Sequence, residues 1–302
     1  MSQGTPLGQA GTRPGFLEVS DLTVAYQQRH AATREVVHQV SLAVQPGRRT
    51  ALVGESGSGK SVTARAILQL DTAAHITGSV KLDGQELIGA GRKDLRQVRG
   101  ARIGLVLQDP LASLNPTMPI GWQIMQPLVI RGVKKKAAKQ RGIDMLRALG
   151  VADAAERFGD FPHQFSGGMR QRVVIAIALV GEPQILIADE PTTALDVRVQ
   201  AQVLDLLDRV TRERDMGVLF ITHDLGIVAG FADDVIVMRR GEVVERAGVM
   251  ELFSAPRHPY TKGLLGAVPR VDMDPSHRLV SVEEIERDAA AIAAGLAEAV
   301  EP

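Results

Sequence analysis

The residues with the most specific chemistry form a glycine-rich loop. Residues 54–61 read Gly-Glu-Ser-Gly-Ser-Gly-Lys-Ser and match the pattern G-x-x-x-x-G-K-[ST] at every position. Glycines let successive backbone N–H groups converge on an anion, the Lys60 ammonium adds a positive charge, and the Ser61 hydroxyl is a ligand type that Mg²⁺ accepts. We therefore predict that the phosphates of a nucleotide bind nine consecutive residues: Gly54, Glu55, Ser56, Gly57, Ser58, Gly59, Lys60, Ser61 and Val62.

Two adjacent acids follow a second apolar segment. Residues 185–188 read Ile-Leu-Ile-Ala and lead directly into Asp189 and Glu190. A buried strand would carry Asp189 to the sheet edge beside the phosphates, where it could hold Mg²⁺. Glu190 would point the other way and could polarise an attacking water as a general base. Taken alone, the pattern fits an ordinary strand end equally well.

A second candidate anion site lies at Ser166, Gly167 and Gly168, before the helical run of residues 173–180. A serine hydroxyl and glycine N–H groups at a helix N-terminus can bind a phosphate, although the same residues also serve as a simple helix cap. Two phosphate sites in one chain are consistent with a dimer in which each chain supplies half of a shared site.

The elements that would position these residues alternate along the chain. Strand patterns cover residues 17–19, 22–24, 36–44, 49–53, 103–107, 185–188, 218–221 and 235–238, and residues 78–82 with the turn at Asp83 predict a hairpin. Helical patterns cover residues 60–70, 137–149 and 199–212. Strands that alternate with helices around a glycine-rich loop predict a mostly parallel sheet covered on both faces.

The chain divides into four predicted parts. We expect a disordered leader at 1–15, a nucleotide-binding core at 16–115 and 182–250, an inserted helical subdomain at 116–181 that carries Ser166, and a C-terminal extension at 251–302 with a surface helix at 282–300. Residues 110–130 lack charge but contain four prolines, so they do not predict a membrane span. We expect them instead to line a groove for a helix of a membrane partner.

Composition excludes several classes of function. Thirty-five basic and 35 acidic side chains give no net charge, which argues against a globally basic nucleic-acid binder. No cysteine is present, so disulfides, cysteine-zinc sites, thiolate iron–sulfur clusters and cysteine nucleophiles are excluded.

At this point the sequence resembles the ATP-binding cassette (ABC) ATPases. The phosphate loop, the Ser-Gly-Gly signature, the Asp-Glu strand, Ala194-Leu195-Asp196 and Ile221-Thr222-His223-Asp224 occur in the order of that family. Ser166 precedes Asp189 by 23 residues and His223 follows it by 34. The resemblance, which covers residues 16–269, implies an α/β fold: a P-loop NTPase (RecA-like) core of ABC type with an antiparallel β edge and an inserted α-helical subdomain.

The resemblance also implies roles for individual residues. Glu190 would be the catalytic base and His223 the switch that contacts the γ-phosphate, while Tyr26 would stack on adenine. Gln108 would sense Mg²⁺, joining Ser61 and Asp189 as the metal-binding residues. Asp196 would contact the second subunit, and Ser166, Gly167 and Gly168 would clamp its nucleotide. ATP and Mg²⁺ are the implied cofactors, and no iron–sulfur cluster is expected.

Residues 108–116, 165–172 and 256–265 are similar to segments of the importers for dipeptides, oligopeptides and nickel. That branch implies two permease subunits, a second ABC ATPase that is identical or a paralogue, and an extracytoplasmic binding protein as an indirect partner. It places the chain on the cytoplasmic face of the membrane as a peripheral subunit. A di- or oligopeptide is the expected cargo, with nickel or another metal complex as the alternative.

Two other classes of function are alternatives. One is a soluble ABC ATPase that acts on nucleic acid or ribosomes, although the neutral charge argues against it and no nucleic-acid partner is expected. The other is a small-molecule kinase, which would leave the Ser-Gly-Gly signature and His223 unexplained.

Overall fold

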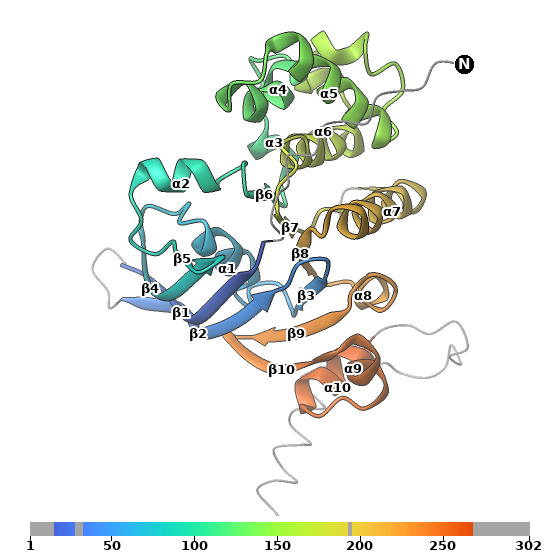
Figure 1. Ribbon diagram of the computed structural model, residues 1–302. Helices are drawn as coiled ribbons and strands as arrows, with labels where there is room; N and C mark the ends of the chain where they lie inside the picture. The colour runs from blue at the N-terminus through green and yellow to red at the C-terminus, as the bar shows by residue number, and fades with distance from the viewer. Residues whose placement is uncertain (1–14, 28–32, 193–194, 268–302) are drawn as a thin grey trace, which may run out of the picture.

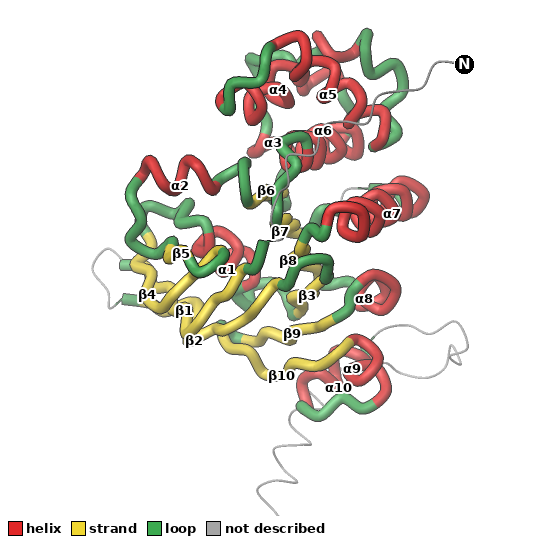
Figure 2. The backbone as a smooth tube through the Cα atoms, viewed as in Figure 1, coloured by secondary structure: helices red, strands yellow, loops and turns green. Residues whose placement is uncertain are grey.

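The structure is a computed structural model that describes residues 15–27, 33–192 and 195–267 (Figure 1). The predicted leader up to residue 14 and the predicted helix at 282–300 lie outside the described residues. The described strands form two sheets, and most of the helices lie above the larger sheet or along its side (Figure 2).

The smaller sheet is antiparallel and has the strand order β2-β1-β4-β5. Its strands are β1 (Leu17–Tyr26), β2 (Arg34–Val44), β4 (Ala74–Leu82) and β5 (Gln85–Glu86). The sequence predicted two strands, at 17–19 and 22–24, where the structure has the single strand β1. An irregularity interrupts the pairing there, because Asp21 adopts a left-handed φ of 49° and shifts the register on both sides of β1.

The larger sheet has the order β10-β9-β3-β8-β7-β6 and is parallel except for β10. Its strands are β3 (Arg49–Val53), β6 (Ile103–Val106), β7 (Ile185–Asp189), β8 (Gly217–Thr222), β9 (Asp234–Arg239) and β10 (Glu242–Gly248). The sequence predicted all of these except β10. Each of β3, β7 and β8 therefore delivers the residues that follow it to the same edge of the sheet.

Both faces of this sheet are covered, which explains why its strands read as continuous apolar runs. Ile185 and Ile187 of β7 face a core shared with the antiparallel sheet, and α1 (Lys60–Ile67) packs in the same core. Leu186 and Ala188 face the opposite core. The mixed α/β fold, with a glycine loop between β3 and α1, confirms the predicted fold class.

The helical block forms a separate lobe above β6 and β7 (Figure 1). After α2 (Arg92–Val98), it contains α3 (Pro110–Ser113), α4 (Ile120–Ile130), α5 (Lys135–Ala148), two 3-10 turns at Arg157–Gly159 and Pro162–Gln164, and α6 (Gly167–Leu179). Ile120, Ile124 and Leu128 are buried in the core of the lobe. These three residues therefore serve core packing, whereas Leu111 and Ile130 of the same stretch are exposed.

The remaining helices are α7 (Val197–Arg214), α8 (Leu225–Phe231), α9 (Val249–Ser254) and α10 (Pro259–Gly266). Helix α7 packs in the core that the lobe shares with β7, whereas α9 and α10 pack in a cluster with β3 and β9. The bounds of α5 and α7 differ from the predicted 137–149 and 199–212 by one or two residues at each end, and two larger differences have a local cause. Helix α1 ends at Ile67 rather than at residue 70, because Gln69 adopts a left-handed φ of 48°. Helix α6 begins at Gly167 rather than at residue 173, because the Ser166 side chain caps it.

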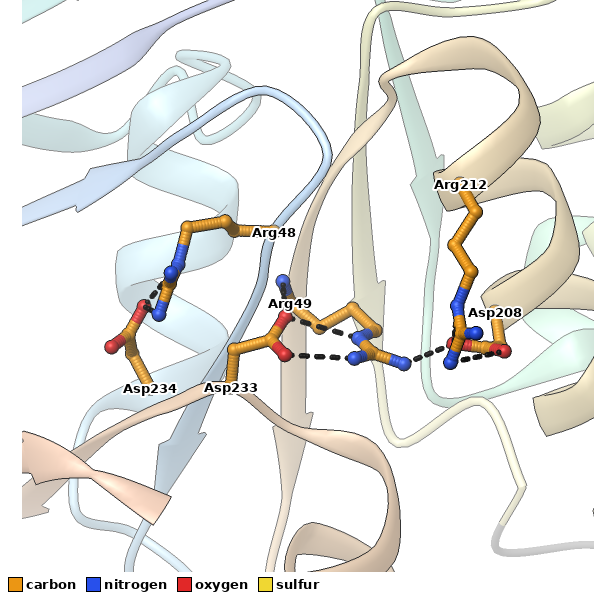
Figure 3. A network of polar contacts seen from close by, with 6 residues as sticks. All are labelled: Arg48, Arg49, Asp208, Arg212, Asp233 and Asp234. Carbon is orange, nitrogen blue, oxygen red and sulfur yellow. Dashed lines mark hydrogen bonds and ion pairs between the residues drawn. The ribbon is translucent and has the colours of Figure 1, made fainter. Parts of the chain in front are cut away.

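A network of charged side chains ties β3 to β9 and α7 (Figure 3). Arg49 donates three hydrogen bonds to Asp233, two from its guanidinium at 2.7 and 3.1 Å and one from its backbone N–H at 2.8 Å. Its guanidinium also contacts Asp208, which in turn accepts from Arg212. Arg48 makes a separate ion pair with Asp234.

Within the described ranges, no helix is both long enough and apolar enough to cross a membrane.

Candidate functional site

The phosphate loop joins the end of β3 to the start of α1. Two of its glycines lie where a side chain would clash: a Cβ on Gly54 would come within 2.1 Å of the Met238 carbonyl oxygen, and one on Gly59 within 2.8 Å of the Met238 side chain. Both also have positive φ values, 152° and 104°. The loop therefore packs directly against β9, and only glycine permits that approach.

Lys60 is buried at the start of α1 and is 5% exposed. Its Nζ donates hydrogen bonds to the carbonyl oxygens of Gly54 at 2.8 Å and Glu55 at 2.7 Å. Burial lowers the pKa of Lys60 below its usual value, although the nearby carboxylates of Glu190 and Asp189 oppose that shift. The ammonium thus lies inside the loop, where a bound anion such as a phosphate would stabilise its charged form.

Ser61 and Asp189 meet across the sheet edge, 128 positions apart in sequence. The Ser61 hydroxyl donates to Asp189 Oδ1 at 3.0 Å, and Asp189 is 1% exposed. Burial raises the pKa of Asp189, and the neighbouring Glu190 carboxylate adds to the rise, while Ser61 and Lys60 oppose it. A buried carboxylate beside a hydroxyl is a site that a divalent cation would stabilise.

Glu190 lies between Gln108 and His223. Its Oε2 accepts a hydrogen bond from Gln108 Nε2 at 3.0 Å, and its Oε1 lies 2.9 Å from His223 Nδ1. These three residues follow β7, β6 and β8 respectively, so the parallel sheet gathers them at one edge. Glu190 has a left-handed φ of 47°, and its carboxylate contacts Gln108 and His223, whereas that of Asp189 accepts from Ser61. The two acids therefore face different partners, as the sequence predicted.

Tyr26, at the end of β1, is held by Asp71 and Arg65, which lie about 40 to 45 positions further along the same chain. Its hydroxyl donates to Asp71 Oδ2 at 2.8 Å, and Arg65 of α1 donates to the same oxygen at 3.0 Å. Burial, followed by the hydrogen bond to Asp71, raises the pKa of Tyr26. The aromatic ring is thereby connected to the helix that begins at the phosphate loop.

The Ser-Gly-Gly segment lies on the helical lobe, at the N-terminus of α6. Ser166 caps that helix by accepting from Met169 N at 3.4 Å, and both Ser166 and Gly167 are exposed. Within residues 15–27, 33–192 and 195–267, no hydrogen bond joins Ser166, Gly167 or Gly168 to the phosphate loop. One copy of the chain therefore does not bring the two predicted phosphate sites into contact.

Asp196 lies exposed at the N-terminus of α7, where its side chain accepts from Val199 N at 3.0 Å. Ala194, which belongs to the same motif, lies outside the described residues. Val62 lies in α1, where it is partly buried and packs against the core shared with the antiparallel sheet.

The donor set at the loop fits a nucleotide with Mg²⁺. Ser61 and Asp189 supply two hard oxygen ligands, and Mg²⁺ characteristically takes only one or two protein ligands together with water and substrate phosphates. In the part of the chain that the structure describes, no group of three or more His, Cys, Asp or Glu side chains is placed to hold a metal ion by itself.

Three residues near the loop were missed by sequence reasoning. Arg65 and Asp71 hold Tyr26, and the Tyr260 hydroxyl accepts a hydrogen bond from Glu55 N of the phosphate loop at 3.0 Å. Tyr260 is fully buried although it lies in a segment rich in proline. The similarity of residues 256–265 to peptide and nickel importers was the available signal, but it carried no information about contacts.

Comparisons with known proteins identify the family of the chain. The sequence model of the family described as "ABC transporter" matches residues 37–193, which include the phosphate loop and the Asp189-Glu190 pair. A second family, "Oligopeptide/dipeptide transporter, C-terminal region", matches residues 244–295.

Similar proteins and structures carry related names. The oligopeptide transport ATP-binding protein OppD of Bacillus subtilis is 44% identical over 88% of this chain and 75% of that protein. The dipeptide transport ATP-binding protein DppD of the same organism is 46% identical over 85% of this chain and 78% of its own length. A solved dimeric structure of the ATP-binding cassette MJ0796, bound to ADP and Pi in a post-hydrolysis state, has 27% identity and a TM-score of 0.71 over 77% of this chain and 98% of its own.

Proposed function

The chain belongs to the ABC transporter family, and we propose that it is the ATP-hydrolysing subunit of an importer of di- or oligopeptides. The ABC ATPase activity follows from the family, and the peptide cargo follows from the names of the relatives. The observation that carries the proposal is the position of Glu190 between Gln108 and His223, beside the Ser61–Asp189 pair.

We assign nucleotide binding to the loop of residues 54–59 with Lys60, Ser61 and Val62. The N–H groups of the loop and of the start of α1 would surround the β-phosphate, and the Lys60 ammonium would lie between the β- and γ-phosphates. Mg²⁺, held by Ser61 and Asp189 with Gln108 nearby, would neutralise charge on those phosphates. The Tyr26 ring would stack on adenine, with Asp71 fixing its hydroxyl.

We assign the proton transfer to Glu190. Its carboxylate lies in a polar cluster, where it would accept a proton from the attacking water as the water oxygen approaches the γ-phosphorus. His223, 2.9 Å away, would keep the carboxylate oriented and contact the γ-phosphate. Gln108 would hold the second carboxylate oxygen.

Two copies of the cassette, or this chain and a paralogue, would complete the site. Ser166 and Gly167 are exposed, Gly168 is half-buried, and among the described residues none of the three is hydrogen-bonded to the chain's own loop, which supports a role in clamping the nucleotide of the facing subunit. Asp196 would contact the same subunit. Hydrolysis would let the two subunits separate, so that ATP drives transport through its stronger binding to the closed dimer.

The helical lobe, residues 116–181, would contact two permease subunits, and residues 16–115 and 182–250 would form the nucleotide-binding core. Ile130 of the lobe and Leu111, which lies just before it in the sequence, are both about 60% exposed and are apolar residues available for such contact. The chain would then act as a peripheral subunit on the cytoplasmic face of the membrane, fed indirectly by an extracytoplasmic binding protein.

Two variants test the nucleotide chemistry. Lys60→Ala should abolish ATP binding in calorimetric titration, whereas Lys81→Ala, a change on the exposed side of β4, should leave the affinity unchanged. Glu190→Gln keeps the size of the side chain and should bind ATP while its turnover falls by about a hundredfold or more. Wild-type turnover in Glu190→Gln would remove that residue from the chemical step.

The partners and the cargo need separate experiments. Tagged Glu190→Gln protein, isolated in mild detergent with ATP, should bring down two permeases and a second ABC ATPase, with Lys60→Ala protein as the matched control. Cells that carry only Glu190→Gln should lose uptake of a labelled tripeptide and retain uptake of labelled nickel. Loss of nickel uptake alone would favour the metal-complex alternative, and ribosomes or nucleic acid without permeases would refute the transport role.

A further inference from the structure

The C-terminal end of the described chain contacts the phosphate loop directly. Tyr260, in α10, accepts a hydrogen bond on its hydroxyl oxygen from Glu55 N at 3.0 Å, across 205 positions of sequence. We propose that Tyr260 is a positioning residue for the phosphate loop, and that the segment 242–267 tunes ATP affinity through it. This inference rests on the proposed nucleotide site, but it assigns a role to a part of the chain that takes no part in the chemistry.

Both backbone polar groups of Glu55 are hydrogen-bonded, so the contact with Tyr260 affects the rest of the phosphate loop. Its N–H donates to Tyr260, while its carbonyl oxygen accepts from Lys60 Nζ at 2.7 Å and from Ser58 N at 3.2 Å. The orientation of the Glu55 peptide units therefore decides both where the Lys60 ammonium rests and how the next N–H groups of the loop converge. Holding the loop before ATP arrives saves the free energy of ordering it during binding.

The Tyr260 ring has its own rigid setting. It is fully buried in a cluster with Val53, the last residue of β3 before the loop, and the Arg239 guanidinium lies 5.1 Å from the ring centre. Its backbone N–H donates to His258 Nδ1 at 3.1 Å, which caps α10. The hydroxyl is therefore presented to Glu55 by packing that does not depend on the loop itself.

Glu245 of β10 anchors the start of α10. Its carboxylate is 9% exposed and accepts from Arg257 N at 2.7 Å and His258 N at 3.0 Å. A buried carboxylate with two backbone donors fixes those two residues, and they immediately precede the helix that carries Tyr260. Glu245 and Tyr260 thus form one path from β10 to the phosphate loop.

The first test is Tyr260→Phe, studied in the full chain by calorimetric titration with Mg-ATP. The variant keeps the ring and loses only the hydroxyl oxygen, so ATP should bind about three- to tenfold more weakly, as expected for one lost backbone hydrogen bond. In the assembled transporter the KM for ATP should rise by a similar factor and kcat should change by less than about twofold. Thr211→Val, which removes a buried hydroxyl from α7, is the matched control and should bind ATP as the wild type does.

A double-mutant cycle tests the path. Glu245→Gln should weaken ATP binding in the wild-type background and have no further effect in Tyr260→Phe, because both changes release the same contact. An equal loss in both backgrounds, or no loss, would overturn the anchoring role of Glu245. Wild-type affinity in Tyr260→Phe would overturn the inference while leaving the proposed function intact, whereas a wild-type chain that fails to bind ATP would overturn both.

Discussion

The charged network at the start of β3 gives a quantitative prediction about stability. Arg49 and Asp233 expose 16% and 28% of their side chains, which share two hydrogen bonds, and Arg49 also contacts Asp208 (Figure 3). The next residues along the chain, Arg48 and Asp234, form a similar pair that is 45% and 43% exposed. The Arg49 pair differs from the Arg48 pair in its deeper burial and in the added contact with Asp208, so the two arginines compare a buried, connected ion pair with an exposed one.

We expect Arg49→Met to lower the free energy of unfolding by about 2 kcal/mol at pH 7. Hydrogen bonds to charged groups contribute about 1.5–3 kcal/mol when desolvated, and removing Arg49 leaves Asp233 partly buried without its cation. Solvent screens the Arg48 pair, so Arg48→Met should lower the free energy of unfolding by less than about 1 kcal/mol. Urea unfolding followed by circular dichroism at 222 nm measures both values.

The same pair predicts a dependence on pH. Burial opposes ionisation of Asp233, but the hydrogen bonds from Arg49 outweigh it and lower the pKa of Asp233 below its ordinary value. The stabilisation is therefore complete above the ordinary carboxyl pKa and is lost as the pH falls through the lowered pKa of the folded state. The stability difference between wild type and Arg49→Met should narrow at acidic pH.

Two results would refute this reasoning. Equal losses in Arg48→Met and Arg49→Met would show that burial does not decide the contribution of these pairs, and a stability difference that stays constant with pH would show that ionised Asp233 is not the partner that matters. ATP affinity should be unchanged in both variants, because Arg49 begins β3 while the phosphate loop follows its other end, about 16 Å away.

Three further predictions concern single positions. Gly121→Ala should lower the free energy of unfolding by about 1–3 kcal/mol, because the new Cβ would lie 2.1 Å from the Phe158 ring; an unchanged urea midpoint would contradict that clash. Asp71→Asn should weaken ATP binding about two- to fivefold, because Tyr26 loses its hydrogen-bond partner, and should leave the binding of inorganic triphosphate unchanged. Equal losses of affinity for both ligands in calorimetry would contradict a role of Asp71 in binding adenine. Asp196→Ala should lower the free energy of unfolding by about 1 kcal/mol through loss of a helix cap while Asp196→Asn should not, and equal urea midpoints for the two variants would argue against capping.

The local pattern of the sequence was sufficient to predict an element wherever neighbouring residues determine its conformation. The strand β3 was predicted with the bounds that the structure has, because an apolar run between a turn and a glycine loop leaves few alternatives. Element ends were harder to predict. The continuous β1 and the early end of α1 both depend on left-handed residues, Asp21 and Gln69, that no pattern of apolar residues reveals.

The residues of the phosphate loop and the pair Asp189 and Glu190 were named from the sequence, because phosphate chemistry requires particular residue types at particular spacings. Arg65, Asp71 and Tyr260 were not, because their part in the site depends on contacts. Only the tertiary structure decided their partners. Glu190 contacts His223 and Gln108 because parallel strands from distant parts of the chain end at one sheet edge. Tyr260 contacts Glu55 because α10 packs beside β3, and sequence distance carries no information about such an encounter. The residue types thus determined which chemistry is available, while long-range packing decided which groups lie close enough to act together.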